Sequence, residues 1–285
     1  MDRLCSFYDH AVDVARQEKL TMVEALDNLK VLGIEKLEVS QNNLLGREDE
    51  VGNELAQCGM GISSIPSYFD FGRDADVEKQ ALPTLEAARY LGAKRLLVIP
   101  GFFREGDDAE SREKQFRGMI DGVNRLADLA ARYDVSLMME DYDSALAPFS
   151  TIEGVRRFLD SCPGLSWCFD TGNFRFSGES ELDGYEILKD RIVHVHLKDR
   201  SYLPTEENPP MPTVDGQRLY PSPVGMGDVR LGEVMSRLKA DGYQGDFSVE
   251  HYGTAYMLGY LVLSTMWVLQ QFGITYCPDE EKGEN

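Results

Sequence analysis

Four side chains able to bind a metal ion follow apolar runs in the second half of the chain. Glu140 follows SLMM, Asp170 ends LSWCFD, His196 lies in IVHVHL and Glu250 follows FSV. The first two intervals each match one strand–helix unit, and the third contains such a unit and a long insertion. Three carboxylates and one imidazole suit an octahedral divalent ion. We expect Mn²⁺ first, with Mg²⁺, Co²⁺ or Zn²⁺ as alternatives, although zinc more often has additional His or Cys ligands.

The segment RIVHVHLKDR places a second histidine two residues before His196. Residues i and i+2 of a strand share a face, so His194 points the same way, one layer deeper. It either fills the interior or orients the ligands from behind, and we expect Asp199 to support the site in a similar way. Lys198 either holds a substrate oxygen or phosphate, or forms a structural ion pair with an acidic residue.

Short apolar runs alternate with amphipathic stretches along the whole chain, which predicts a parallel sheet buried on both faces. Strands are expected at 4–10, 36–41, 61–68, 95–101, 135–142, 165–172, 192–199 and 247–253. Helices are expected at 21–33, 77–92, 111–133, 151–161 and 229–242. Eight strands favour an α/β fold of the single (β/α)8 TIM barrel type. An open doubly wound sheet is the alternative, but no GxGxxG motif follows the first strand.

One connection is much longer than the others and rich in proline. Residues 201–228 lie between the seventh strand and the next helix, and we expect them to form a lid over the carboxyl ends of the strands. The barrel then spans 1–277, and the polar residues 278–285 form a tail. The apolar stretch 256–273 is either the closing helix or a subunit contact, in which case the protein is a homo-oligomer.

Composition limits the partners of the 285-residue chain. Its formal net charge of −20 argues against nucleic acid or an anionic membrane as the main partner. The five cysteines are scattered and never spaced CxxC, which predicts neither a disulfide framework nor a zinc knuckle. With no signal-peptide pattern and no membrane-length apolar run, a cytoplasmic protein is expected.

The second half of the chain resembles a known family. The segments that carry the resemblance are Glu140, DTGN (170–173), HVHLKD (194–199), GMGD (225–228) and GYQGDFSVE (242–250). They are similar to xylose isomerase-like TIM barrels, the sugar phosphate isomerase/epimerase group. In the first half, GIEKLEVS (33–40) looks like the family's second strand.

The resemblance implies roles for the four ligand residues. Glu140, Asp170, His196 and Glu250 match the family's metal ligands, and the two glutamates also match its proton-shuttling pair. Physical chemistry supports this double role, because a metal that chelates a carbonyl and its adjacent hydroxyl stabilises the enediolate left when the α-proton is removed. Two carboxylates on opposite faces can then remove and return that proton.

Several nearby residues are candidates for contacting the substrate. Asn173 matches a substrate-contacting position of the family. Tyr142 stands where many relatives have a histidine, and it contributes either a hydroxyl acid or base or simply a wall. His10 ends the first expected strand and faces the pocket in one interpretation. Two segments differ from the ketose 3-epimerases of this family. One is EDYDSALAPF, which begins at the first candidate ligand, and the other is SYLP, where those epimerases have an arginine.

Four functions are compatible with this pattern to different degrees. The first is a metal-dependent isomerase or epimerase of a sugar, a polyol or a derivative of one, acting in carbohydrate metabolism. The second is a lyase on the same barrel that is inosose dehydratase-like or cleaves carbon–glycosides. An AP endonuclease would need more than four histidines and a positively charged groove. A non-catalytic binding subunit would hold no metal.

Overall fold

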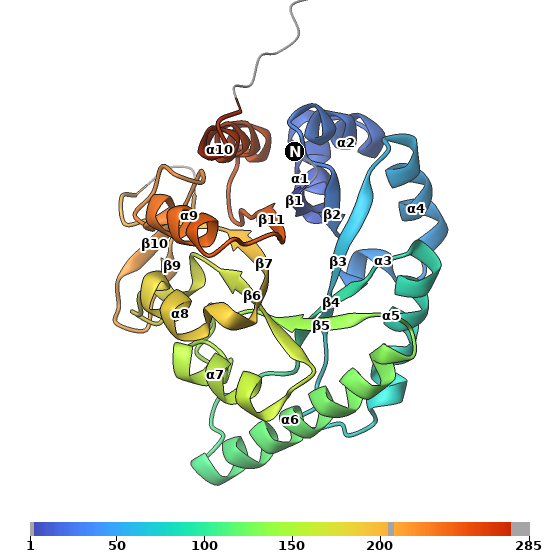
Figure 1. Ribbon diagram of the computed structural model, residues 1–285, viewed down its shortest axis with the longest axis vertical. Coiled ribbons are helices and arrows are strands. Elements are labelled where there is room, and N and C mark those ends of the chain that lie inside the picture. Colours follow the sequence, from blue (N-terminus) through green and yellow to red (C-terminus); the bar gives the residue numbers. More distant parts are fainter. Residues whose placement is uncertain (1–2, 205–207, 275–285) are drawn as a thin grey trace, which may run out of the picture.

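A closed barrel of eight parallel strands forms the centre of the structure (Figure 1). The computed structural model describes residues 3–204 and 208–274. The barrel strands are β1 (Leu4–Phe7), β2 (Lys36–Glu38), β3 (Gly61–Tyr68), β4 (Arg95–Ile99), β5 (Ser136–Met139), β6 (Leu165–Asp170), β7 (Ile192–Leu197) and β11 (Asp246–Val249). Neighbours in sequence are neighbours in the barrel, and β11 closes it by pairing with β1. The single (β/α)8 barrel expected from the sequence is therefore confirmed.

Helices surround the barrel on its outer side (Figure 1). They are α1 (Tyr8–Glu18), α2 (Met22–Val31), α3 (Gln41–Leu44), α4 (Glu48–Gln57), α5 (Val77–Leu91), α6 (Ala109–Ala131), α7 (Ile152–Ser161), α8 (Glu181–Leu188), α9 (Leu231–Ala240) and α10 (Met257–Gln271). Two short 3-10 turns lie at Asn173–Arg175 and Lys189–Arg191. Several N-termini are closed by side chains, such as Thr21 and Glu24 in a reciprocal capping box. The helices thereby start at fixed positions outside each strand.

The first strand ends earlier than the sequence pattern indicated. β1 stops at Phe7, and Tyr8 already begins α1. His10 was expected at the end of a strand, and that expectation is wrong, because it lies in the first turn of a helix. The helices α1, α4 and α8 were also absent from the expected set, whereas the helices near 21–33, 77–92, 111–133, 151–161 and 229–242 all occur within a few residues.

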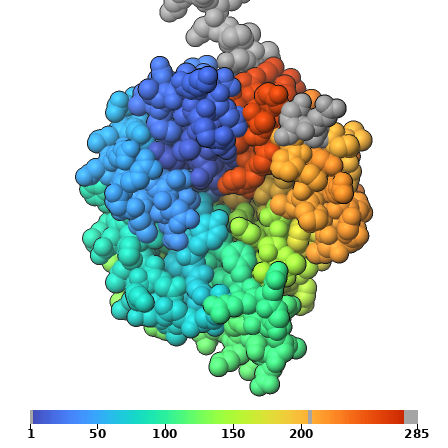
Figure 2. All heavy atoms as spheres, turned by 180° about the vertical axis from the view of Figure 1, so that it is seen from behind, coloured from blue at the N-terminus to red at the C-terminus, as the bar shows by residue number. Residues whose placement is uncertain are grey.

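The two ends of the described chain close the barrel against each other. Helix α10 contacts α1 and β11, and the N-terminal (blue) and C-terminal (red) parts pack side by side in Figure 2. The apolar stretch 256–273 therefore contains the closing helix, with Leu263 and Met266 on its exposed side. The expected tail, 278–285, lies outside the described residues. Within 3–204 and 208–274, no helix has the length and apolar character needed to cross a membrane.

The long connection after β7 contains a small antiparallel sheet. Its strands are β8 (Asp199–Ser201), β9 (Met211–Pro212) and β10 (Arg218–Ser222), with β10 in the middle. The Asp199 carboxylate holds the returning end of this insertion, since Oδ2 accepts hydrogen bonds from the N–H groups of Gly225 and Gly227, each at 2.9 Å. Its Oδ1 accepts two further backbone N–H groups. Asp199 thus fastens the insertion to the end of β7.

Replacing Asp199 by alanine should loosen the insertion. Four backbone N–H groups would lose their acceptor, and we expect a loss of about 3 kcal/mol in the free energy of unfolding. For a chain of this size, that corresponds to a melting temperature lower by about 5 °C. Differential scanning calorimetry measures the shift. Asp190→Ala, at an exposed position, is the control and should change stability by less than about 0.5 kcal/mol. Equal melting temperatures for the two variants would contradict this role.

Candidate metal centre

Strand register brings the four expected ligands to one level of the barrel. They follow or lie in β5, β6, β7 and β11, which are consecutive around the barrel. Asp170 pairs directly with His196 across β6 and β7. Glu140 is the residue after β5, and Glu250 is the residue after β11. All four side chains thus leave the same, carboxyl end of the barrel, where active sites of this fold lie.

The four side chains converge on one point. One ligand atom from each of Glu140, Asp170, His196 and Glu250 lies within 4.8 Å of the others. The Nδ1 atom of His196 is 2.9 Å from Glu140 Oε2 and 3.0 Å from Glu250 Oε2. It is 3.9 Å from Asp170 Oδ2. Every one of these residues is buried, so the cluster is held by the protein with little solvent around it.

Two carboxylate oxygens at the centre of the cluster have no hydrogen-bond partner among the described residues. Asp170 Oδ2 and Glu250 Oε2 are both buried in this state, and their nearest cationic or imidazole groups, Lys198 at 3.5 Å and His196 at 3.0 Å respectively, are not aligned for a hydrogen bond. The other oxygen of Asp170 is fixed by the N–H groups of Gly172 and Asn173, at 2.7 and 2.8 Å. Buried anionic oxygens without donors are costly unless a cation lies between them. The donor set and its unpartnered atoms therefore fit a divalent ion.

Electrostatics leads to the same conclusion. Burial raises the pKa of Glu140, and it raises the pKa of Asp170 well above its ordinary value. Burial also raises the pKa of Glu250, but the charges of Lys198 and His196 outweigh it and hold that pKa well below its ordinary value. Three negative charges cannot coexist here without compensation, so a bound cation would offset the charge of those carboxylates that are ionised.

Sequence reasoning missed Glu38, a fully buried residue at the end of β2. Its Oε1 atom is 2.9 Å from Nε2 of His196 and 2.8 Å from Nε2 of His194. Two serine hydroxyls, those of Ser64 and Ser248, also donate to this carboxylate. With Nε2 of His196 bonded to Glu38, Nδ1 is left to face the ligand cluster, as in many metal sites. The signal was present in KLEVS, where an acidic residue interrupts a buried strand.

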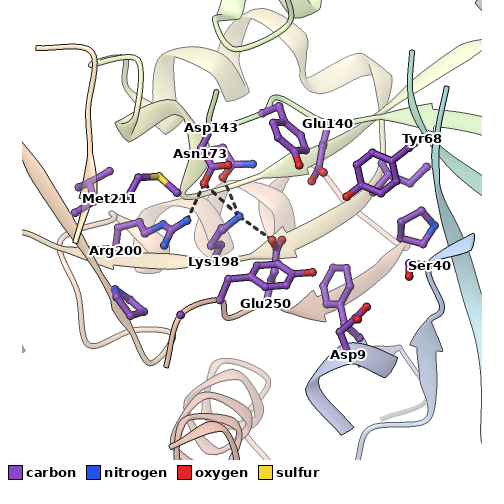
Figure 3. A pocket seen from close by; sticks show the side chains of 18 of the residues that line it. Asp9, Ser40, Tyr68, Glu140, Asp143, Asn173, Lys198, Arg200, Met211 and Glu250 are labelled. Atoms are coloured by element: carbon purple, nitrogen blue, oxygen red, sulfur yellow. Dashed lines mark hydrogen bonds and ion pairs between the residues drawn. The ribbon is translucent and has the colours of Figure 1, made fainter. Parts of the chain in front are cut away.

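A cavity of about 660 Å³ opens in front of the cluster (Figure 3). Glu140, Tyr142, Asn173, Lys198 and Glu250 all line it, and four of these are labelled in Figure 3. The Lys198 ammonium donates to Glu250 Oε1 at 2.7 Å and to Asn173 Oδ1 at 2.9 Å. Lys198 thus forms an ion pair with a site carboxylate, and because it also lines the cavity, its contact with a substrate stays a prediction.

The remaining expected residues lie behind the cavity. His194 is fully buried and bonded to Glu38, so it stands beneath the cluster. His10 is buried against His251, whose backbone N–H donates to its Nε2 at 3.1 Å, and it is not among the residues that line the cavity. Burial lowers its pKa to about 4, so the ring stays neutral at pH 7. Asp199 bonds backbone groups of the insertion rather than a ligand.

The sequence pattern of one known family matches most of the chain. That family is described as "Xylose isomerase-like TIM barrel", and the match covers residues 12–259. This chain belongs to that family. The resemblance noted from residues 140–250 is thereby confirmed and extends over the first half of the barrel.

Relatives of this xylose isomerase-like barrel include enzymes. The chain is 31% identical to inosose dehydratase from Geobacillus thermodenitrificans over 144 residues, 48% of this chain and 47% of that enzyme. The chain spans about half the length of the curated relatives that it matches.

Two solved structures show the same fold at low sequence identity. One is a xylose isomerase-like TIM barrel protein from Mycobacterium smegmatis in complex with magnesium, with a TM-score of 0.64, 21% identity and 87% of each chain covered. The other is 3-keto-D-glucoside 4-epimerase from E. coli, with a TM-score of 0.66 and 17% identity over 95% of this chain and 99% of that one.

Removing one ligand should weaken metal binding without affecting the rest of the barrel. We expect Asp170→Asn to lower the affinity for Mn²⁺ at least about tenfold, because one ligand charge is lost. Isothermal titration calorimetry measures the affinity. The control is Asp246→Asn, which removes a buried carboxylate that pairs with Lys36 and Arg95 on β2 and β4, at the opposite end of the barrel. Undiminished binding by Asp170→Asn would reject the site.

Glu38→Gln should weaken Mn²⁺ binding although Glu38 is not a ligand. An amide no longer fixes Nε2–H of His196 as a carboxylate does, and we expect about 10–100-fold lower affinity. Electron paramagnetic resonance of free Mn²⁺ measures the change. The matched control is Glu181→Gln, which alters another fully buried glutamate, bonded to Arg175 and Arg230. Equal affinities in both variants would show that Glu38 does not position the histidine.

Proposed function

We propose that this chain is a divalent-metal-dependent isomerase or epimerase of sugars or polyols that acts by removing a proton next to a carbonyl. The observation that carries the proposal is the placement of Glu140 and Glu250. They come from strands three positions apart in the barrel and approach the centre of the cavity from opposite sides (Figure 3). A carbon atom held between them would present one face to each carboxylate.

Different residues would have different roles in such a reaction. Glu140, Asp170, His196 and Glu250 would hold the ion, which when bound polarises a carbonyl and makes the neighbouring C–H group more acidic. One glutamate then accepts the proton, and the other returns a proton to the opposite face or to the neighbouring carbon. Lys198 keeps Glu250 oriented through its 2.7 Å bond.

The other lining residues would hold the substrate in place. Asn173 and Tyr142 present polar groups beside the glutamates. Residues within 209–221 of the insertion line one side of the cavity, and we propose that this described part acts as the lid that excludes water during proton transfer. Its residues Met211 and Leu219 belong to the cavity wall.

A dehydratase is the second candidate, and the inosose dehydratase relatives favour it. Elimination begins with the same removal of a proton by one carboxylate. It differs in the second step, where the other carboxylic acid protonates a leaving hydroxyl instead of carbon. The same residues thus support both reactions, and the product distinguishes them.

Deuterium incorporation tests the proton abstraction. The Mn²⁺-loaded protein is incubated in D₂O with a panel of ketoses, inososes and keto-glycosides, and the products are analysed by NMR and mass spectrometry. We expect deuterium at the carbon next to the carbonyl, with an isomer or epimer as the product. A product one water lighter would establish the dehydratase instead.

The two glutamates should be needed for the exchange. Glu140→Gln and Glu250→Gln should each lower the exchange rate by about 10²–10⁴-fold, because each removes one acid–base group. Asp246→Asn, which retains all four ligands, serves as the control and should keep the rate within a few fold. If the panel shows no exchange at all, or if the glutamine variants exchange as fast as the parent protein, the proposed function is wrong.

A further inference from the structure

The cavity has two unlike ends. In Figure 3, Met211 and Arg200 lie on one side and Tyr68 and Ser40 on the other, with the metal-site glutamates between them. The first end is built by the insertion after β7, and the second by the start of α1, the segment from Ser40 into α3, and the end of β3. A substrate centred on the glutamates therefore meets a different surface in each direction.

The insertion contributes an apolar wall. Its side chains that line the cavity are Pro209, Pro210, Met211, Leu219 and Pro221. None of them carries a charge or a hydrogen-bonding side chain, and three are prolines, which restrict the backbone. Met211 is half-buried and can adjust to ligand shape. Binding an apolar ligand group against such a wall is favourable because both surfaces are removed from water. The wall has no charged or hydrogen-bonding side chain that could bind a phosphate.

The opposite end is rich in hydrogen-bonding groups. Asp9, Ser40, Asn42 and Asn43 line it, and the amide of Asn43 donates to Asp9 at 2.7 Å. Amide, hydroxyl and carboxylate groups at close spacing suit the hydroxyls of a sugar ring. The polar part of a substrate would lie here.

Among the residues that the structure describes, the two cationic side chains that line the cavity are already paired. Arg200, at the insertion end, is buried and bonded to Asp143 at 2.8 Å. Lys198 is bonded to Glu250 at 2.7 Å and lies 3.5 Å from Asp170. A phosphate would have to break a buried ion pair and approach several carboxylates, which is unfavourable.

We infer that the insertion forms an apolar subsite for an uncharged aromatic ring attached to the sugar, so that the substrate class is an aryl keto-glycoside, whose sugar supplies the carbonyl, rather than a phosphorylated sugar. This inference rests on the proposed function for the sugar half. The cavity volume of about 660 Å³ exceeds what one monosaccharide ring fills and lies in the range for larger ligands, ~300–1,000 Å³. The prolines and Met211 are part of the wall of this cavity.

Paired probes test the subsite on the intact, Mg²⁺-loaded protein. The probes are phenyl and methyl pyranosides of glucose, galactose, mannose and xylose, in both anomers, together with glucose and glucose 6-phosphate. Isothermal titration calorimetry measures the affinities. For at least one sugar, the phenyl glycoside should bind about tenfold tighter than the methyl glycoside, because its ring covers apolar surface. Glucose 6-phosphate should bind no tighter than glucose.

A pair of variants locates the effect. Met211→Ser should reduce the preference for the phenyl glycoside at least threefold and leave Mg²⁺ affinity and methyl glycoside affinity unchanged. Met226→Ser changes a methionine of the same insertion that is 63% exposed and outside the cavity wall, and it should keep the full preference.

The results separate this inference from the proposed function. Equal affinity for phenyl and methyl glycosides, no binding of either, or tighter binding of the phosphate would each overturn the apolar subsite. Deuterium exchange into a small ketose would then still support the proposed chemistry. Loss of that exchange, with the phenyl preference retained, would reject the chemistry and leave the subsite in place.

Discussion

The crowding of three carboxylates at one buried point is the constraint that the rest of the structure serves. Glu140, Asp170 and Glu250 meet around Nδ1 of His196 with little water near them, and such a concentration of charge is unstable without cations. Lys198 supplies one positive charge, and the unpartnered oxygens leave a place for another. Strand register, the turn after β6 and the insertion each help to hold or to cover this group of charges.

A polar layer inside the barrel supports the cluster from below. Glu38 joins both histidines of β7 with the hydroxyls of Ser64 and Ser248. Burying such a hydrogen-bond network is unfavourable unless nearly every polar group has a partner. A network whose groups are nearly all paired holds its side chains in one geometry. The layer binds Nε2 of His196, on the side of the ring that faces away from the three carboxylates. The direction in which Nδ1 points is therefore set by the barrel interior.

The barrel and the convergence of the four candidate ligands could be predicted because they depend on local patterns. An apolar run followed by an acidic residue marks a strand end, and consecutive strand ends meet in a barrel. Glu38 follows the same pattern, but it lies far from the four candidate ligands in sequence, and its partners become neighbours only when the barrel closes. His10 was misplaced because an apolar strand passes into a helix at Tyr8 without a turn residue. The β8–β9–β10 sheet pairs short segments across a long loop, which no local pattern specifies.

The glutamates and the apolar wall of the insertion are held in the structure in different ways, and this difference suits them to different roles. The glutamates stand on strands that are paired on both sides, so their separation is set by the barrel and cannot easily change. The opposing wall is carried by a small sheet that is fastened at its return by Asp199. A rigid floor suits proton transfer, which tolerates little displacement. A wall on a separate insertion can alter in shape and chemistry without disturbing that floor, and this is the physical reason for proposing that the insertion contributes to the choice of substrate.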